Sequence, residues 1–126
     1  MGEGTGAGMG TRRRFDHLEL GRRGEELAAR WYLDAGCRVI ACNWRCAAGE
    51  LDIVAICGDT VVFCEVKARS STRFGSPLEA VDRTRRTRIR NAAAEFLRTR
   101  RPGGHAVRFD VAAVVGGRAE VVREAF

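Results

Sequence analysis

The sequence predicts a single small α/β domain in which a mixed central sheet is flanked by helices. Two neighbouring strand-like segments, residues 51–57 and 61–67, are apolar on both faces, as strands covered on each side of a sheet are. An amphipathic helical pattern lies on either side of them in the chain. The 126 residues are 45% apolar, which excludes a disordered chain and fits one domain.

The elements are expected in the order helix, three strands, helix and strand, with a short last edge strand. Residues 1–14 alternate glycines and end in three arginines, which predicts a flexible basic tail before a domain over residues 15–126. Apolar residues at three- and four-residue spacing predict a first helix over residues 18–35, ended by Gly36. The strands are expected over residues 37–45, 51–57, 61–67, 108–115 and 119–122.

The second helix has a clear predicted start. Ser76, Pro77 and Glu79 form a capping box, so the helix is expected to begin at Pro77 and to end near Arg100. Its predicted buried stripe also contains Arg85. A charge in that stripe either reaches a partner, such as a phosphate or an acidic site residue, or extends along the apolar surface to solvent.

The cysteines and the N-terminus indicate a cytoplasmic protein. No segment resembles a signal peptide or is apolar over a membrane-spanning length. The five cysteines are odd in number and form no C-x-x-C pair, so they are expected to be reduced and buried. A zinc site is disfavoured because the spacing of its candidate ligands fits no common pattern: Cys37, Cys42, Cys46 and His17.

The hairpin between the two apolar strands brings acidic residues together. A tight two-residue turn fixes a register that places Asp52 opposite Glu65. By the same register Glu50 faces Lys67, and alternation projects all four side chains from one face. Two facing carboxylates repel each other, and Mg²⁺ or Mn²⁺ would resolve that repulsion. Ordinary ion pairs of Lys67 with Glu50 and Asp52 are the simpler interpretation.

Lys67 is the only lysine in a chain that has 22 Lys and Arg residues. Because arginine serves elsewhere as the general surface cation, the retained lysine indicates a need for a compact ammonium that can lose its proton. Two residues after Glu65, it can orient or deprotonate a water molecule or neutralise charge on a phosphate. Two carboxylates, a divalent cation and a lysine are suited to phosphodiester hydrolysis.

Asp52, twelve intervening residues and Glu65-Val66-Lys67 resemble the D-x(n)-E-x-K signature of the PD-(D/E)XK nuclease superfamily. Further segments over about residues 20–115 resemble the YraN family of endonuclease-like proteins. They are GRRGE at 21–25, NWR at 43–45, GELDIV at 49–54, VVFCEVKARS at 61–70, FG at 74–75, EAV at 79–81 and RFDV at 108–111.

The resemblance implies a restriction-endonuclease-like core, similar to that of archaeal Holliday junction resolvases. In such a core Asp52 and Glu65 hold Mg²⁺ or Mn²⁺ with the backbone carbonyl of Val66, and Lys67 assists the nucleophilic water. Glu25 on the first helix joins the site; its simpler interpretation is a first-turn acid favoured by the helix dipole. Junction-cutting proteins of this fold act as symmetric dimers, which leaves a homodimer open.

The net charge of +6 favours a polyanionic partner. Arginines near the predicted site are candidates for phosphate contacts, although a solvated basic face is the simpler interpretation of any one of them: Arg45, Arg69, Arg73, Arg83, Arg85, Arg86 and Arg90. We therefore predict a Mg²⁺-dependent DNA endonuclease, acting on branched or damaged structures. A non-catalytic nucleic-acid-binding module of the same fold, within a larger complex, is the second hypothesis, and a basic scaffold that binds only protein is the third.

Overall fold

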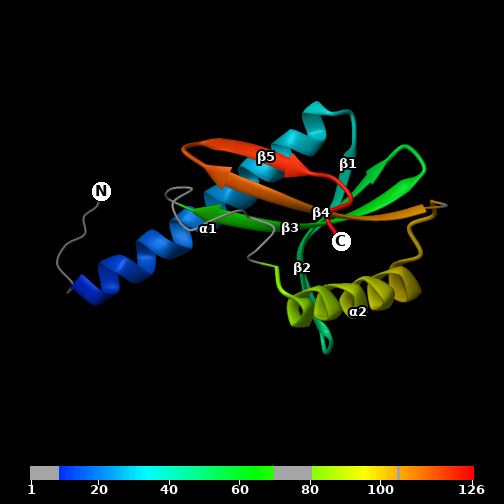
Figure 1. The fold of residues 1–126 in the computed structure, drawn as a ribbon, viewed down its shortest axis with the longest axis horizontal. Coiled ribbons are helices and arrows are strands. Elements are labelled where there is room, and N and C mark those ends of the chain that lie inside the picture. The colour runs from blue at the N-terminus through cyan, green and yellow to red at the C-terminus, as the bar shows by residue number, and fades with distance from the viewer. Residues whose placement is uncertain (1–8, 70–80, 105) are drawn as a thin grey trace.

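The computed structural model describes residues 9–69, 81–104 and 106–126, with side chains from residue 20 onward. Over these residues the chain forms two helices and one five-stranded sheet in the order β1-β2-β3-β4-β5 (Figure 1). Strands β3 and β4 run parallel and the other neighbours antiparallel, which confirms the predicted α/β class and mixed sheet. The elements are α1 (Met9–Asp34), β1 (Arg38–Cys46), β2 (Gly49–Cys57), β3 (Thr60–Arg69), α2 (Arg83–Arg100), β4 (Ala106–Val115) and β5 (Arg118–Val122).

The two helices cover different cores of the sheet, because successive residues of β2 and β3 alternate between them. Ile53 and Val62 are fully buried in the core that contains Ala28 and Tyr32 of α1. The other core packs the alternate residues of β2 and β3 against α2 and contains these residues: Val54, Val61, Phe63, Ile89, Ala92 and Phe96. Burial on both faces explains the continuous apolar runs in the sequence.

The register of β2 against β3 is the predicted one, but the pairing is shorter. Ile53 pairs with Cys64 at the last matched position before the open end. Beyond it, the Val66 N–H donates a hydrogen bond to the Asp52 carboxylate at 2.8 Å. The Asp52 side chain thus accepts from a backbone N–H that would bond to a backbone carbonyl if the ladder were longer. The expected Glu50–Lys67 cross-strand pair is absent from the described ladder.

Both helix starts differ from the prediction. Helix α1 begins at Met9 and not near residue 18, so residues 9–14 are helical; arginine is a good helix former, which permits a polar N-terminal extension. Helix α2 begins at Arg83, because Asp82 caps it by accepting the Arg85 N–H at 2.8 Å. The proposed capping box at residues 76–79 lies outside the described residues. Neither helix, as described, is long and apolar enough to cross a membrane.

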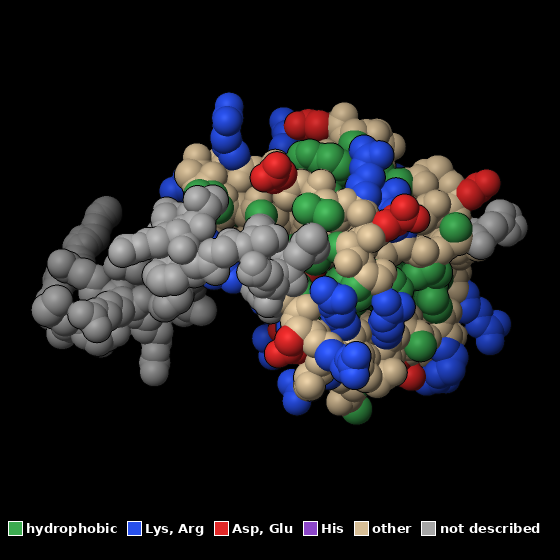
Figure 2. Space-filling model, viewed as in Figure 1, with side chains coloured by type: hydrophobic (Ala, Val, Ile, Leu, Met, Phe, Trp, Pro, Cys, Tyr) green, Lys and Arg blue, Asp and Glu red, His purple; other side chains and the backbone are tan. Residues whose placement is uncertain are grey.

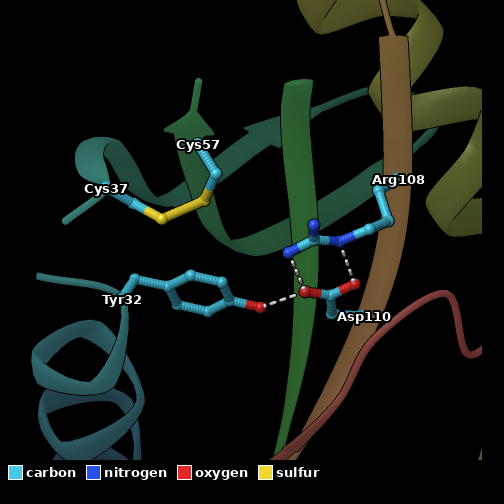
Figure 3. The surroundings of a disulfide bond; sticks show 5 residues. All are labelled: Tyr32, Cys37, Cys57, Arg108 and Asp110. Atoms are coloured by element: carbon cyan, nitrogen blue, oxygen red, sulfur yellow. Dashed lines mark hydrogen bonds and ion pairs between the residues drawn. A yellow bond between two sulfur atoms is a disulfide. The ribbon is translucent and has the colours of Figure 1, made fainter. Parts of the chain in front are cut away.

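Cys37 and Cys57 form a disulfide that joins the start of β1 to the end of β2 (Figure 3). The prediction of five reduced, buried cysteines is therefore wrong. Arg38 pairs with Ile56, and this register makes Cys57 the cross-strand neighbour of Cys37. Of the other cysteines, Cys64 is buried, whereas Cys42 is exposed and Cys46 half-buried.

A buried carboxylate ties α1 to β4 and to the C-terminal segment. Asp110 is fully buried, and Tyr32 of α1 donates its hydroxyl to Asp110 Oδ2 at 2.6 Å (Figure 3). Arg108 donates to both carboxylate oxygens at 2.9 and 3.0 Å, and the Glu124 N–H donates at 3.0 Å. Because its oxygens are satisfied within the protein, we assign Asp110 a structural role.

Candidate functional site

Two predicted acidic residues meet at the open end of the β2–β3 hairpin. Asp52 is 8% exposed and Glu65 is 3% exposed. Burial, and next the nearby Glu65 charge, raise the pKa of Asp52 to about 7, against the lowering effect of the Val66 N–H. The two carboxylates therefore interact as expected from the register, although the backbone pairing stops one residue earlier.

Glu65 is held by two cations. Arg85 donates from Nε to Oε2 at 2.9 Å and from Nη2 to Oε1 at 3.1 Å. The Lys67 ammonium lies 3.3 Å from Oε2 of the same carboxylate. The hydrogen bond to Glu65 raises the pKa of Arg85. Arg85, the charge predicted inside the apolar stripe of α2, thus reaches a site carboxylate and does not extend to solvent alone.

The ion pairs suggested by the sequence are arranged differently. Lys67 pairs with Glu65, its neighbour along β3, and not with Glu50 across the hairpin. Glu50 instead accepts a hydrogen bond from Arg45 Nε of β1 at 3.2 Å. Glu50 and Arg45 therefore satisfy each other at the edge of the site, and Lys67 pairs with the buried Glu65 carboxylate.

Glu25 approaches the same site from α1. Its Oε1 accepts a hydrogen bond from Asn43 Nδ2 of β1 at 3.0 Å, and its charge contributes to the raised pKa of Asp52. Glu25 lies well inside α1, so its interpretation as a first-turn acid is wrong. Asn43 was not predicted as a site residue; its φ of 52° falls in the left-handed region that asparagine tolerates.

Gly24 permits the close approach of α1 to β3. A Cβ atom at this position would lie 2.7 Å from the Ala68 Cβ. Gly24 is buried and precedes Glu25, so the absence of its side chain helps to set the distance of Glu25 from the sheet.

The donor set suits a hard divalent cation. Mg²⁺ commonly takes one or two carboxylates and completes its shell with water and phosphate oxygens. Asp52 and Glu65 supply such oxygens, and a cation would relieve the repulsion that raises the pKa of Asp52. Within the described ranges, no three His, Cys, Asp or Glu side chains are grouped to hold a metal by themselves. A cation at this site would share Glu65 with Arg85 and Lys67.

Basic side chains gather over α2 (Figure 2). Arg83 is exposed in its first turn. Arg86 is half-buried, donates to the Val81 carbonyl at 2.8 Å and lies over the Phe126 ring, and Arg90 also stacks on aromatic rings. These contacts restrict the side chains of Arg86 and Arg90, which therefore differ from arginines on a fully solvated surface. Arg73 lies outside the described residues.

The fold and this cluster define a small α/β protein with two buried carboxylates flanked by a lysine and an arginine. The model of the uncharacterised protein family UPF0102 matches residues 24–114, and the chain belongs to this family, the YraN family. The match spans all the acidic and basic residues of the cluster.

Three relatives illustrate this similarity. A UPF0102 protein of Beutenbergia cavernae is 47% identical, over 82% of this chain and 88% of its own. One of Rhodococcus jostii is 44% identical, over 87% and 98% of the two chains. One of Syntrophus aciditrophicus is 41% identical, over 90% and 93%.

Proposed function

We propose that the protein is a divalent-metal-dependent endonuclease with a restriction-endonuclease-like core, which hydrolyses phosphodiester bonds of branched or damaged DNA. The observation that carries the proposal is the burial of Asp52 beside Glu65, with the Lys67 ammonium 3.3 Å from Glu65 Oε2. A buried acidic pair beside the only lysine is a costly arrangement for stability alone, and it supplies the groups that phosphodiester hydrolysis requires.

Each residue has a role that follows from its position. Asp52, Glu65 and the Val66 carbonyl would hold Mg²⁺ or Mn²⁺. When bound, such a cation supplies positive charge for the phosphate and acidifies water. Lys67 as the ammonium would orient the attacking water, and as the neutral amine it would accept the proton of that water. Arg85 keeps Glu65 neutralised, and Glu25, oriented by Asn43, adds negative charge near Asp52.

Binding would rest on the basic face. The net charge of +6 and the arginines over α2 favour a phosphate backbone over an uncharged or basic partner (Figure 2). Arg83 is exposed on the first turn of α2, the same turn that directs Arg85 to Glu65. A DNA strand that contacts this turn would therefore lie next to the buried carboxylates.

A non-catalytic nucleic-acid-binding module is the second candidate. It is favoured by one observation: both oxygens of Glu65 are engaged by Arg85, and Lys67 shares one of them. A site neutralised by its own cations can be stable without a metal, and the same arginines would still bind phosphates.

The test is cleavage of labelled four-way junction, flap, single-stranded and duplex DNA in Mg²⁺ or Mn²⁺. Lys67→Ala and Asp52→Asn serve as site variants. Arg30→Gln is the matched control, because Arg30 on α1 is exposed and, among the described residues, pairs with Asp34. Cleavage by the wild type and Arg30→Gln, lost in both site variants, would support the enzyme. Salt-sensitive binding without cleavage by any of the four proteins would select the non-catalytic module.

A further inference from the structure

A pocket of about 300 Å³ opens between α1, the end of β3 and the β4–β5 turn. Figure 1 shows this turn beside α1. The volume of the pocket lies at the small end of the range for ligand sites, roughly 300–1,000 Å³. Its lining combines apolar side chains with two arginines and the glycines of the turn: Leu20, Leu27, Val114, Arg23, Arg69 and Gly116.

Arg69 lines this pocket and has a side-chain nitrogen without a hydrogen-bond partner. Its Nε atom is buried and has no hydrogen-bond partner, and it is the only such side-chain atom found in the described part of the chain. A buried donor without an acceptor is unfavourable, and an anionic ligand would supply the acceptor. Arg23 adds a second guanidinium from α1, so the pocket has two cations for one anionic group.

The pocket also presents an apolar wall and a backbone free of side chains. Leu20 and Leu27 lie one above the other on α1 across from Val114 of β4, and a flat apolar ring can pack on such a surface. Gly116 and Gly117 at the turn let a ligand approach the backbone closely. A simple inorganic anion would use the arginines and leave this apolar wall unused.

We propose that this pocket binds one phosphorylated nucleotide unit, its phosphate on Arg69 and Arg23 and its base against the apolar wall. The inference rests on the proposed function, which it extends to the strand next to the cleaved bond. Arg69 follows Lys67 by two residues on β3, a backbone distance of about 7 Å. The pocket therefore adjoins the carboxylate site along β3, on the side of the sheet that α1 covers.

The experiment is calorimetric titration of the full chain in EDTA, so that no metal at Asp52 and Glu65 contributes. The probes are thymidine 5′-monophosphate, a short oligothymidylate, thymidine and inorganic phosphate. The variants are Arg69→Gln, Arg69→Lys and Arg23→Gln. Arg30→Gln on the same helix is the matched control, because Arg30 is exposed and pairs only with Asp34 among the described residues. Circular dichroism checks that each variant is folded.

The expected result is binding of the monophosphate, weakened about tenfold or more in Arg69→Gln and Arg23→Gln and unchanged in Arg30→Gln. Arg69→Lys keeps the charge but loses the buried Nε donor, and is also expected to bind weakly. Tighter binding of the oligothymidylate would identify a strand as the source of the nucleotide. Equal or weaker binding would identify a free nucleotide.

Three outcomes would overturn the inference: no binding of the monophosphate, equal binding of inorganic phosphate, or binding indifferent to Arg69. The failure of the proposed function gives a different result. Nucleotide binding without DNA cleavage would support the nucleotide pocket and contradict the nuclease activity. DNA cleavage without nucleotide binding would support the nuclease activity and contradict the nucleotide pocket.

Discussion

Arg85 of α2 donates hydrogen bonds to both carboxylate oxygens of Glu65, from Nε to Oε2 at 2.9 Å and from Nη2 to Oε1 at 3.1 Å. The side chain of Glu65 is 2% exposed, so this contact neutralises a carboxylate that water cannot solvate. The guanidinium therefore stabilises the site in the absence of a metal, and a divalent cation would compete with it for the same oxygens.

Replacing Arg85 tests this competition. We expect Arg85→Gln to lower the free energy of unfolding in EDTA by about 1–2 kcal/mol, less than for a fully buried pair because a third of the Arg85 side chain is exposed. Millimolar Mg²⁺ should raise the melting temperature of Arg85→Gln more than that of the wild type. Arg98→Gln, which loses an exposed pair, serves as the control. Equal Mg²⁺ effects in wild type and Arg85→Gln would contradict the competition.

Asp52 should make stability in EDTA fall as the pH rises. Its pKa is raised from 3.8 to about 7, so the folded state binds the proton more tightly than the unfolded state does. That stabilisation is complete below about pH 4 and is lost as the pH rises through 7. Asp52→Asn has no such pH-dependent loss. At pH 8 we therefore expect its free energy of unfolding to exceed that of the wild type by a few kcal/mol.

Urea unfolding of both proteins from pH 4 to pH 8 provides the measurement. Adding Mg²⁺ at pH 8 should stabilise the wild type and leave Asp52→Asn unchanged. Parallel pH curves for the two proteins in EDTA would argue against the buried, repelled carboxylate.

Two glycines of α1 provide a matched pair of substitutions. Gly24→Ala would place a Cβ 2.7 Å from the Ala68 Cβ, and we expect a loss of about 1–2 kcal/mol from overpacking. Gly21→Ala meets nothing within 4 Å and should stabilise the helix by up to about 1 kcal/mol. Chemical denaturation measures both. A stabilising Gly24→Ala would show that α1 does not need this close approach to β3.

The Tyr32 hydroxyl should contribute to stability and not to activity. Tyr32→Phe removes a 2.6 Å hydrogen bond to the fully buried Asp110 and should cost about 1–3 kcal/mol in urea unfolding. DNA cleavage at a temperature where both proteins are folded should be unchanged. A double-mutant cycle with Asp110→Asn isolates the pair. Lost cleavage in a fully folded Tyr32→Phe would instead assign the network to the site.

Reduction of the Cys37–Cys57 disulfide should destabilise the protein without altering the carboxylate site. The bond closes a loop with a sequence separation of 20 residues, for which the chain-entropy model gives about 3 kcal/mol. Cys37→Ser and the dithiothreitol-treated wild type should melt at the same lowered temperature. Cys42→Ser, which changes an exposed free thiol, is the control. A melting temperature insensitive to dithiothreitol would show that this bond does not stabilise the fold.

The elements and the site carboxylates could be predicted from the sequence because local patterns encode them. Alternation and the tight turn place Ile53 against Cys64, which puts Asp52 near Glu65. The same reasoning could not find where the ladder ends, because the Asp52 side chain competes for the Val66 N–H only once the strands are in place. It also assigned the start of α2 to a capping box, whereas Asp82 caps the helix six residues later than predicted.

The sequence by itself determined the α/β class, the β2–β3 register and the identity of the acidic pair with Lys67, since each follows from spacing along one or two adjacent segments. It also marked Arg85 as a charge that required a partner. Only the tertiary structure decided that this partner is Glu65, that Glu25 bonds to Asn43, and that Cys37 joins Cys57. These contacts depend on how separate elements pack, and distances between such elements are fixed by the whole core and not by any local pattern.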